Sequence, residues 1–159
     1  MFSRLLKGVH WIEDSLLVAS LASMLGMAVL QILLRNFFDF GIFWAESFLR
    51  ILVLWVAMLG AMVATRESNH ISIDVLTRYV SGVSLRIVSF VGKAFSALVC
   101  GVVAYYAFLY VQFEYVDETI EFAKVPTWLC QSIIPVGFSV MSLRFSLQAV
   151  LSLVRGVPA

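Results

Sequence analysis

Long runs of uncharged, mostly apolar residues alternate with short polar clusters along this chain. Three of these runs cover residues 15–34, 94–113 and 125–143, and each is closed at both ends by a charged residue. Because a helix rises 1.5 Å per residue, about 20 apolar residues cross the roughly 30 Å of hydrocarbon in a bilayer. Each run therefore predicts one transmembrane helix.

A fourth apolar run lies between Arg50 and Arg66, but residues 51–65 form only about 22 Å of helix. This run is too short to cross a bilayer alone, so the helix must extend back through Arg50 towards Trp44. The sequence predicts a single four-helix membrane domain over residues 1–159, with spans at about 14–35, 45–65, 87–113 and 126–150. Pro135 lies inside the last span and is expected to bend it.

Composition supports a membrane protein. Hydrophobic residues make up 62% of the 159 residues and charged residues 13%, whereas soluble domains are about a quarter charged. A soluble core of this size cannot hide so much apolar surface, so the excess must face membrane lipids. The fold class predicted is an all-α integral membrane protein. A net charge of only +1 implies no nucleic-acid partner.

Basic residues in the connections predict the orientation of the spans, because lysine and arginine concentrate on the cytoplasmic side. They occur before the first span (Arg4, Lys7), between the second and third (Arg66, Arg78, Arg86) and after the fourth (Arg155). The connection between the third and fourth spans is acidic instead, with Glu114, Asp117, Glu118 and Glu121 against Lys124. Both termini are therefore predicted to be cytoplasmic, with Lys93 and Arg144 as anchors at the inner interface.

Two further segments have the apolar stripe of a helix that lies in the membrane interface. The first is a lead-in over about 2–12, and the second covers about 70–84, between the second and third spans. Asp74 and Arg78 of the second segment are spaced to pair at i and i+4. His70 precedes this pair and suits a capping or hydrogen-bonding role better than that of a proton carrier.

Glu46 and Arg50 stand at i and i+4 near the start of the second span. At this spacing the two side chains can meet on one helix face and form a pair directed towards protein. The alternative is that Arg50 extends to the phosphate headgroups, about one turn away. The short distance to Arg66 leaves the helix little room to slide outward, which favours the pair.

Residues that could carry chemistry are sparse. The sequence contains no glycine-rich phosphate loop, metal-ligand cluster or nucleophile with a neighbouring base, so no enzymatic activity and no cofactor are predicted. Cys100 and Cys130 lie in different spans, where two small packing residues are favoured over a redox pair. The acidic connection is either a solvated loop or a docking surface for a soluble partner outside the membrane, through Asp117, Glu118 and Glu121.

One set of motifs resembles a known family. The pattern W-x-E-x-x-x-R at Trp44, Glu46 and Arg50 is followed by an apolar helix with L-G-A at residues 59–61, and then by R-x-x-x-H-I-x-I-D from Arg66 through His70 to Asp74. This set is similar to the small membrane subunit of tripartite ATP-independent periplasmic (TRAP) transporters. The family often has a second acidic residue beside the first, where this chain has Ser47.

The resemblance implies a protein of the bacterial inner membrane that binds a large permease subunit and works with a periplasmic substrate-binding protein. In that family the large subunit carries the substrate and sodium sites, and the small subunit enlarges the fixed scaffold. The residues implied in polar subunit contacts are Trp44, Glu46, Arg50, Arg66, His70 and Asp74. The implied function is support of sodium-coupled uptake of small organic carboxylates.

The sequence argues against two other classes of protein. A self-sufficient homodimeric exporter of the small multidrug type needs a carboxylate inside the membrane, and residues 15–34 of the first span contain none. A quinone-linked or haem protein needs paired histidines or cysteines, whereas the only histidines, His10 and His70, are both predicted on the cytoplasmic side. The small-subunit hypothesis is therefore favoured.

Overall fold

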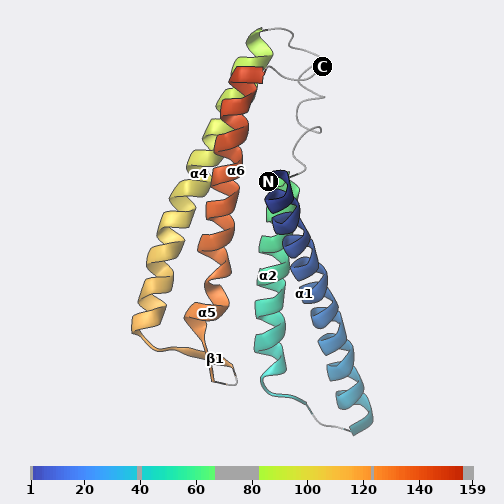
Figure 1. The fold of residues 1–159 in the computed structure, drawn as a ribbon. Coiled ribbons are helices and arrows are strands. Elements are labelled where there is room, and N and C mark those ends of the chain that lie inside the picture. Colours follow the sequence, from blue (N-terminus) through green and yellow to red (C-terminus); the bar gives the residue numbers. More distant parts are fainter. Residues whose placement is uncertain (1, 39–40, 67–82, 123, 156–159) are drawn as a thin grey trace. The chain divides into compact units, whose positions relative to one another are not determined.

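The computed structural model describes residues 2–38, 41–66, 83–122 and 124–155, and these residues are mainly helical (Figure 1). Its long helices are α1 (Phe2–Phe38), α2 (Ala45–Arg66), α4 (Val83–Val116) and α6 (Ile133–Arg155). A short helix, α5 (Thr127–Gln131), precedes α6, and two short strands, β1 (Ile120–Phe122) and β2 (Val125–Pro126), lie between α4 and α5.

Four segments of the described chain are long and apolar enough to cross a membrane: His10–Phe38, Ala45–Arg66, Ile87–Val116 and Thr127–Ser152. The predicted all-α, four-span fold is thereby confirmed. The expected lead-in over 2–12 is continuous with the first span, as part of α1. The predicted interfacial helix over 70–84 lies outside the described residues up to residue 82, and residues 83–84 begin α4. The cytoplasmic location of the termini stays a prediction.

The chain divides into two compact units, and the first contains residues 1–63 and 109–133. Within it α1 lies beside α2, because Gly60 leaves room for a leucine: a Cβ at Gly60 would lie 3.9 Å from Leu17 Cδ1. On α2 the indole of Trp55 donates a hydrogen bond to the carbonyl of Cys130 at the end of α5 (Nε1···O 2.9 Å). The buried apolar residues of this unit are Ala45, Met58, Leu59, Met62, Cys130 and Ile133.

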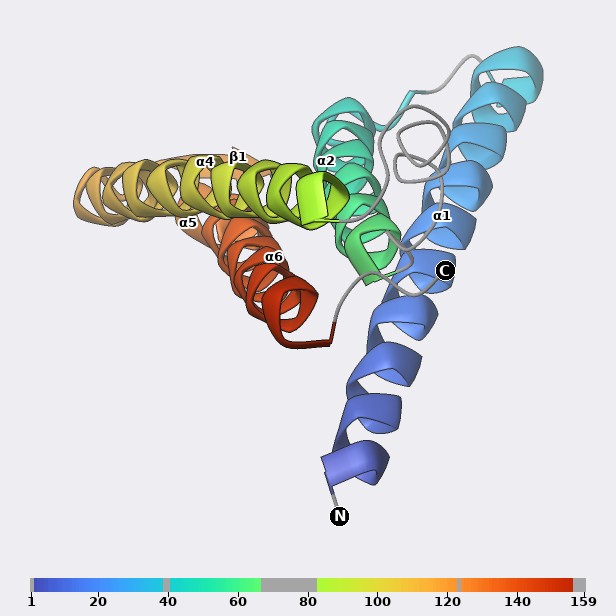
Figure 2. The same cartoon turned by 90° about the horizontal axis from the view of Figure 1, so that it is seen from above.

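The second unit, residues 64–108 and 134–159, is built around the contact between α4 and α6, which lie side by side in both views (Figures 1 and 2). The Ser142 hydroxyl of α6 donates to the Ala97 carbonyl of α4 (2.8 Å). A Cβ at Gly101 would lie only 3.3 Å from Ser142 Oγ, so the two backbones approach closely here. The buried apolar residues of this unit are Ala97, Ala104, Met141 and Ala149.

The last span contains a one-residue turn at Ser132, close to the bend predicted at Pro135, and Ser132 keeps helical dihedrals (φ −56°, ψ −23°). Its helix stops at Gln131, passes through Ser132 and resumes at Ile133. Pro135 lacks the amide hydrogen that would bond to the Gln131 carbonyl four residues earlier. The restart places Pro135 in the first turn of α6, where a helix amide has no intrahelical partner in any case. The missing amide hydrogen of Pro135 therefore accounts for the turn at Ser132 within the span Thr127–Ser152.

Candidate functional site

The start of α2 is formed by a turn that places Trp44 at its entrance. The Ala45 amide donates to the Ile42 carbonyl, and the Phe48 amide donates to the Trp44 carbonyl, with an N···O distance of 3.1 Å in both bonds. The rings of Trp44 and Phe48 pack edge to face with centroids 6.0 Å apart. The Trp44 side chain is 43% exposed. An exposed indole at the start of a span suits the boundary between membrane and water.

Glu46 and Arg50 both lie on the exposed surface of α2. No ion pair joins these two described residues, although their spacing allowed one. The intrahelical pair expected from the sequence is therefore not formed within the chain alone. A surface pair at this spacing stabilises a helix by only about 0.2–0.5 kcal/mol, too little to hold two long side chains together. Both charges are instead directed outward, where another molecule can reach them.

The exposed residues of α2 form a single stripe. They are Glu46, Arg50, Val53, Ala57 and Ala64, and steps of four, three, four and seven residues keep them on one side of a helix. The opposite side carries Trp55, which bonds to Cys130, and the buried residues Met58 and Met62. The helix thus uses one side within its own chain and leaves the other side uncovered.

The basic residues predicted near the inner end are spread over three helices. Arg66 ends α2, Lys93 lies in α4 and Arg144 lies in α6, and all three are partly buried. Arg66 and Arg144 each have an interaction partner. His70 and Asp74, the remaining residues of the predicted polar set, lie outside the described residues.

The acidic connection forms a small hairpin, where the sequence indicated a loop. Strands β1 and β2 pair antiparallel, with Phe122 opposite Val125. Before β1, the Thr119 hydroxyl donates to the Glu114 carboxylate (2.5 Å), and the Thr127 amide donates to the Thr119 carbonyl (2.9 Å). These bonds hold the hairpin against the ends of α4 and α5.

The three predicted docking residues sit on this hairpin and the turn that precedes it. Asp117 and Glu118 are exposed, and Glu121 is half-buried in β1. Glu118 has a φ of 49°, a left-handed conformation that is uncommon for a residue with a side chain. The hairpin thus presents two carboxylates openly and the third less so.

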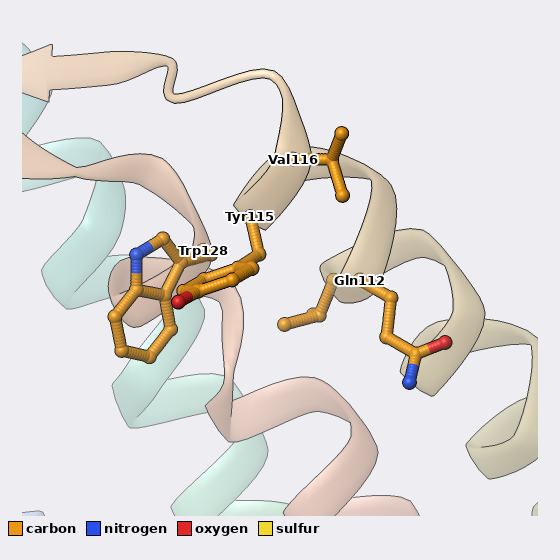
Figure 3. A pocket seen from close by; sticks show the side chains of 5 residues that line it. Gln112, Tyr115, Val116 and Trp128 are labelled. Carbon is orange, nitrogen blue, oxygen red and sulfur yellow. The ribbon is translucent and has the colours of Figure 1, made fainter.

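A pocket of about 400 Å³ lies next to the hairpin, lined by Val111, Gln112, Tyr115, Val116 and Trp128. The rings of Tyr115 and Trp128 pack edge to face with centroids 5.6 Å apart, and the Gln112 amide points away from both rings (Figure 3). The lining offers aromatic and aliphatic surface with one amide. The Tyr115 hydroxyl is the one titratable group among these five lining residues.

Two of the polar contacts inside the described spans join α2 to the last span, and neither was predicted from the sequence. One is the Trp55 bond to Cys130, and the other is a bond from the Gln148 side chain of α6 to the Thr65 carbonyl near the end of α2 (3.1 Å). The last carbonyls of a helix lack intrahelical donors, so Gln148 satisfies one of them. The available signal was a glutamine inside an otherwise apolar segment, but its partner depends on how the helices pack.

Metal and redox chemistry find little support in the described part of the chain. No group of three or more His, Cys, Asp or Glu residues there could hold a metal ion. Cys100 and Cys130 are free thiols, the first partly buried and the second buried. This arrangement fits the packing role considered for both residues.

Comparison with known proteins gives a consistent result. Residues 24–156 match the model of the family described as "Tripartite ATP-independent periplasmic transporters, DctQ component". The chain is 32% identical over 103 residues to the C4-dicarboxylate TRAP transporter small permease protein DctQ of Rhodobacter capsulatus, covering 64% of this chain and 45% of that protein. A putative TRAP transporter small permease protein of Haemophilus influenzae is 31% identical over 94 residues, which cover 57% of this chain and 58% of that protein.

A third relative is a longer protein. The sialic acid TRAP transporter permease protein SiaT of Haemophilus influenzae is 36% identical over 68 residues, which are 43% of this chain but only 10% of that protein. The matched segments thus span less than two thirds of each relative. The family match covers most of this chain, in agreement with its four spans. The chain therefore belongs to the DctQ component family of tripartite ATP-independent periplasmic transporters, as a multi-pass transport protein of the bacterial inner membrane and not an enzyme.

Proposed function

We propose that this chain is the small scaffold subunit of a secondary-active importer and supports a large permease subunit in the membrane. The observation that carries the proposal is the exposure of Glu46 and Arg50 on a membrane-spanning helix, without an ion pair between them. Charged groups inside a span are rare and usually meet a partner. A permease subunit packed against this helix would supply that partner.

The substrate class follows from the relatives. Two of them carry names that specify C4-dicarboxylate and sialic acid transport, and both substrates are organic carboxylates. We infer that the complete transporter takes up a small organic carboxylate with a sodium gradient and that sodium and substrate bind the large subunit. This chain holds no cofactor in the proposal. A periplasmic binding protein delivers the substrate and docks near Asp117, Glu118 and Glu121.

The proposal is tested by co-purification. This chain would be co-expressed with the large permease encoded beside it, and complexes would be isolated through a tag on the large subunit. Glu46→Ala and Arg50→Ala are each expected to weaken association, because removing one partner of a desolvated charge pair costs about 2–5 kcal/mol. Uptake of the transported carboxylate into cells should fall in parallel.

Arg35→Ala is a matched control. Arg35 is also an exposed arginine close to the end of a membrane-spanning helix, so its loss should leave assembly and uptake unchanged. Full co-purification and full uptake by both α2 variants would contradict the scaffold role. Export of a substrate by this chain expressed alone would favour the self-sufficient exporter instead.

A further inference from the structure

The four spans differ in what they expose. α1, α4 and α6 expose many large apolar side chains, including Leu25, Phe95 and Leu143. Between Ala45 and Arg66, by contrast, α2 exposes only one, Val53. Its other exposed residues are two charged side chains and two alanines. Lipid tails favour bulky apolar surface, so the exposed stripe of α2 is poorly suited to lipid.

No described residue forms an ion pair with either charge on this stripe. Arg50 lies one turn, about 6 Å, further into the helix than Glu46. Glu46 is near the end of the span and can reach water, whereas Arg50 must either bend back towards the headgroups or meet an acceptor at its own depth. An acceptor at that depth is what a neighbouring protein helix can offer.

After Arg50, towards the C-terminal end of α2, the exposed side chains of the stripe are uncharged and shorter. After Arg50 the stripe carries Val53 and then two small residues, Ala57 and Ala64, seven positions apart. Small side chains on one helix face let two helix backbones approach closely in a membrane. The reverse side of α2 is already occupied by the contact between Trp55 and Cys130. A second helix on the uncovered side would therefore meet charged groups at Glu46 and Arg50 and pack closely around Ala57.

We propose that one transmembrane helix of the large permease subunit packs along the α2 stripe defined by Glu46, Arg50, Val53 and Ala57. This inference rests on the proposed function and identifies the surface involved. The partner helix carries a carboxylate or an unpaired backbone carbonyl opposite Arg50, a donor opposite Glu46, and close-packed apolar residues opposite Val53 and Ala57. The contact fixes both the depth and the rotation of the large subunit against this chain.

Photocrosslinking identifies the occupant directly. Benzoylphenylalanine would be introduced in place of Val53, Ala57 or, as a control, Val102 of α4, in membranes that contain this chain and the large permease encoded beside it. Val53 and Val102 are matched valines within spans, 54% and 48% exposed. Irradiation should yield adducts with the large subunit from positions 53 and 57, at least about tenfold above the yield from position 102.

Substitution gives a second measurement. Val53→Phe adds bulk where close packing is expected and should weaken association with the large subunit about tenfold or more, whereas Val102→Phe should leave it unchanged. Failure of the unsubstituted chain to co-purify with the large subunit would overturn the proposed function. Where the unsubstituted pair does co-purify, three crosslinking results would overturn the α2 assignment: equal adducts from all three positions, adducts only between two copies of this chain, or no protein adduct from positions 53 and 57. Equal effects of the two phenylalanine substitutions would also overturn it.

Discussion

The indole of Trp55 illustrates how one polar atom fixes two helices in a mostly apolar protein. Its Nε1 donates to the Cys130 carbonyl over 2.9 Å, close to the point where α5 ends. Without water in the hydrocarbon region, a carbonyl left without a donor is unfavourable. The bond therefore joins the middle of α2 to the turn in the last span, and it also directs the opposite side of α2 outward.

Replacing this indole tests how much the hydrogen bond from Trp55 to Cys130 contributes to stability. Trp55→Phe keeps an aromatic ring but removes the donor, so the free energy of unfolding should fall by about 0.5–2 kcal/mol, the range of side-chain hydrogen bonds within membranes. The measurement is reversible unfolding in mixed micelles. Trp11→Phe is the control, because the Trp11 side chain is 73% exposed and its change should stay within about 0.5 kcal/mol. Equal effects of the two substitutions would show that the bond contributes nothing.

At the scale of elements, the positions of the spans could be predicted from the sequence because bilayer thickness imposes a minimum apolar length. The short run after Arg50 even required α2 to start near Trp44, and α2 begins at Ala45. The turn at Ser132 and the hairpin after α4 could not be predicted in the same way. Pro135 is compatible with either a bend or a turn, and the hairpin depends on bonds such as that of Thr119 to Glu114.

The candidate site was predictable to a similar extent. The residue types at Glu46 and Arg50 and their position on one face followed from the i, i+4 spacing. Their failure to pair did not follow from it, because the choice between a weak surface pair and two outward charges is decided by rotamers and surroundings. The hydrogen bonds from the Trp55 and Gln148 side chains could not be predicted either, because both join residues more than 70 positions apart in the sequence.

The contact between α4 and α6 provides a prediction for a pair of elements. A Cβ at Gly101 would lie 3.3 Å from Ser142 Oγ, and this hydroxyl is held by its bond to the Ala97 carbonyl. Gly101→Ala should therefore lower the free energy of unfolding by about 1–3 kcal/mol through overpacking. Gly60→Ala is the control, because its added Cβ would meet Leu17 at an ordinary 3.9 Å.

A double-mutant cycle separates overpacking from an effect on the helix itself. Ser142→Ala removes the atom that the new Cβ would meet, so Gly101→Ala should cost less in the Ser142→Ala background than in the unsubstituted chain. Both unfolding free energies would be measured in mixed micelles. An unchanged cost in the two backgrounds would place the effect of Gly101→Ala elsewhere than at Ser142.

At the scale of the whole molecule, the spans bury little within the chain. None of the most apolar window of α1 is buried, and only 6% of that of α4. Such surfaces are stable only against lipid or another membrane protein. The exposed apolar surfaces of α1 and α4 agree with the proposed role of this chain as a subunit that packs against a larger membrane protein.

The acidic hairpin supplies the last prediction, which concerns the assembled transporter. The basic residues in the other connections predict that this hairpin lies on the outer side of the membrane, and the exposed carboxylates of Asp117 and Glu118 give it a negative surface. Complementary charge mainly raises the rate of encounter between proteins. The triple change Asp117→Lys, Glu118→Lys and Glu121→Lys should therefore slow carboxylate uptake about tenfold at limiting binding protein and low salt, where screening is weak.

The conditions of this experiment distinguish docking from damage to the fold. Uptake should approach the rate of the unsubstituted transporter at saturating binding protein, because encounter no longer limits it, and the difference should shrink as ionic strength rises. The neutral set Asp117→Asn, Glu118→Asn and Glu121→Gln should have an intermediate effect, and asparagine tolerates the left-handed backbone at residue 118. Equal uptake by all three transporters at limiting binding protein would mean that the hairpin does not receive it, whereas a deficit that persists at saturation would indicate a structural role for these carboxylates.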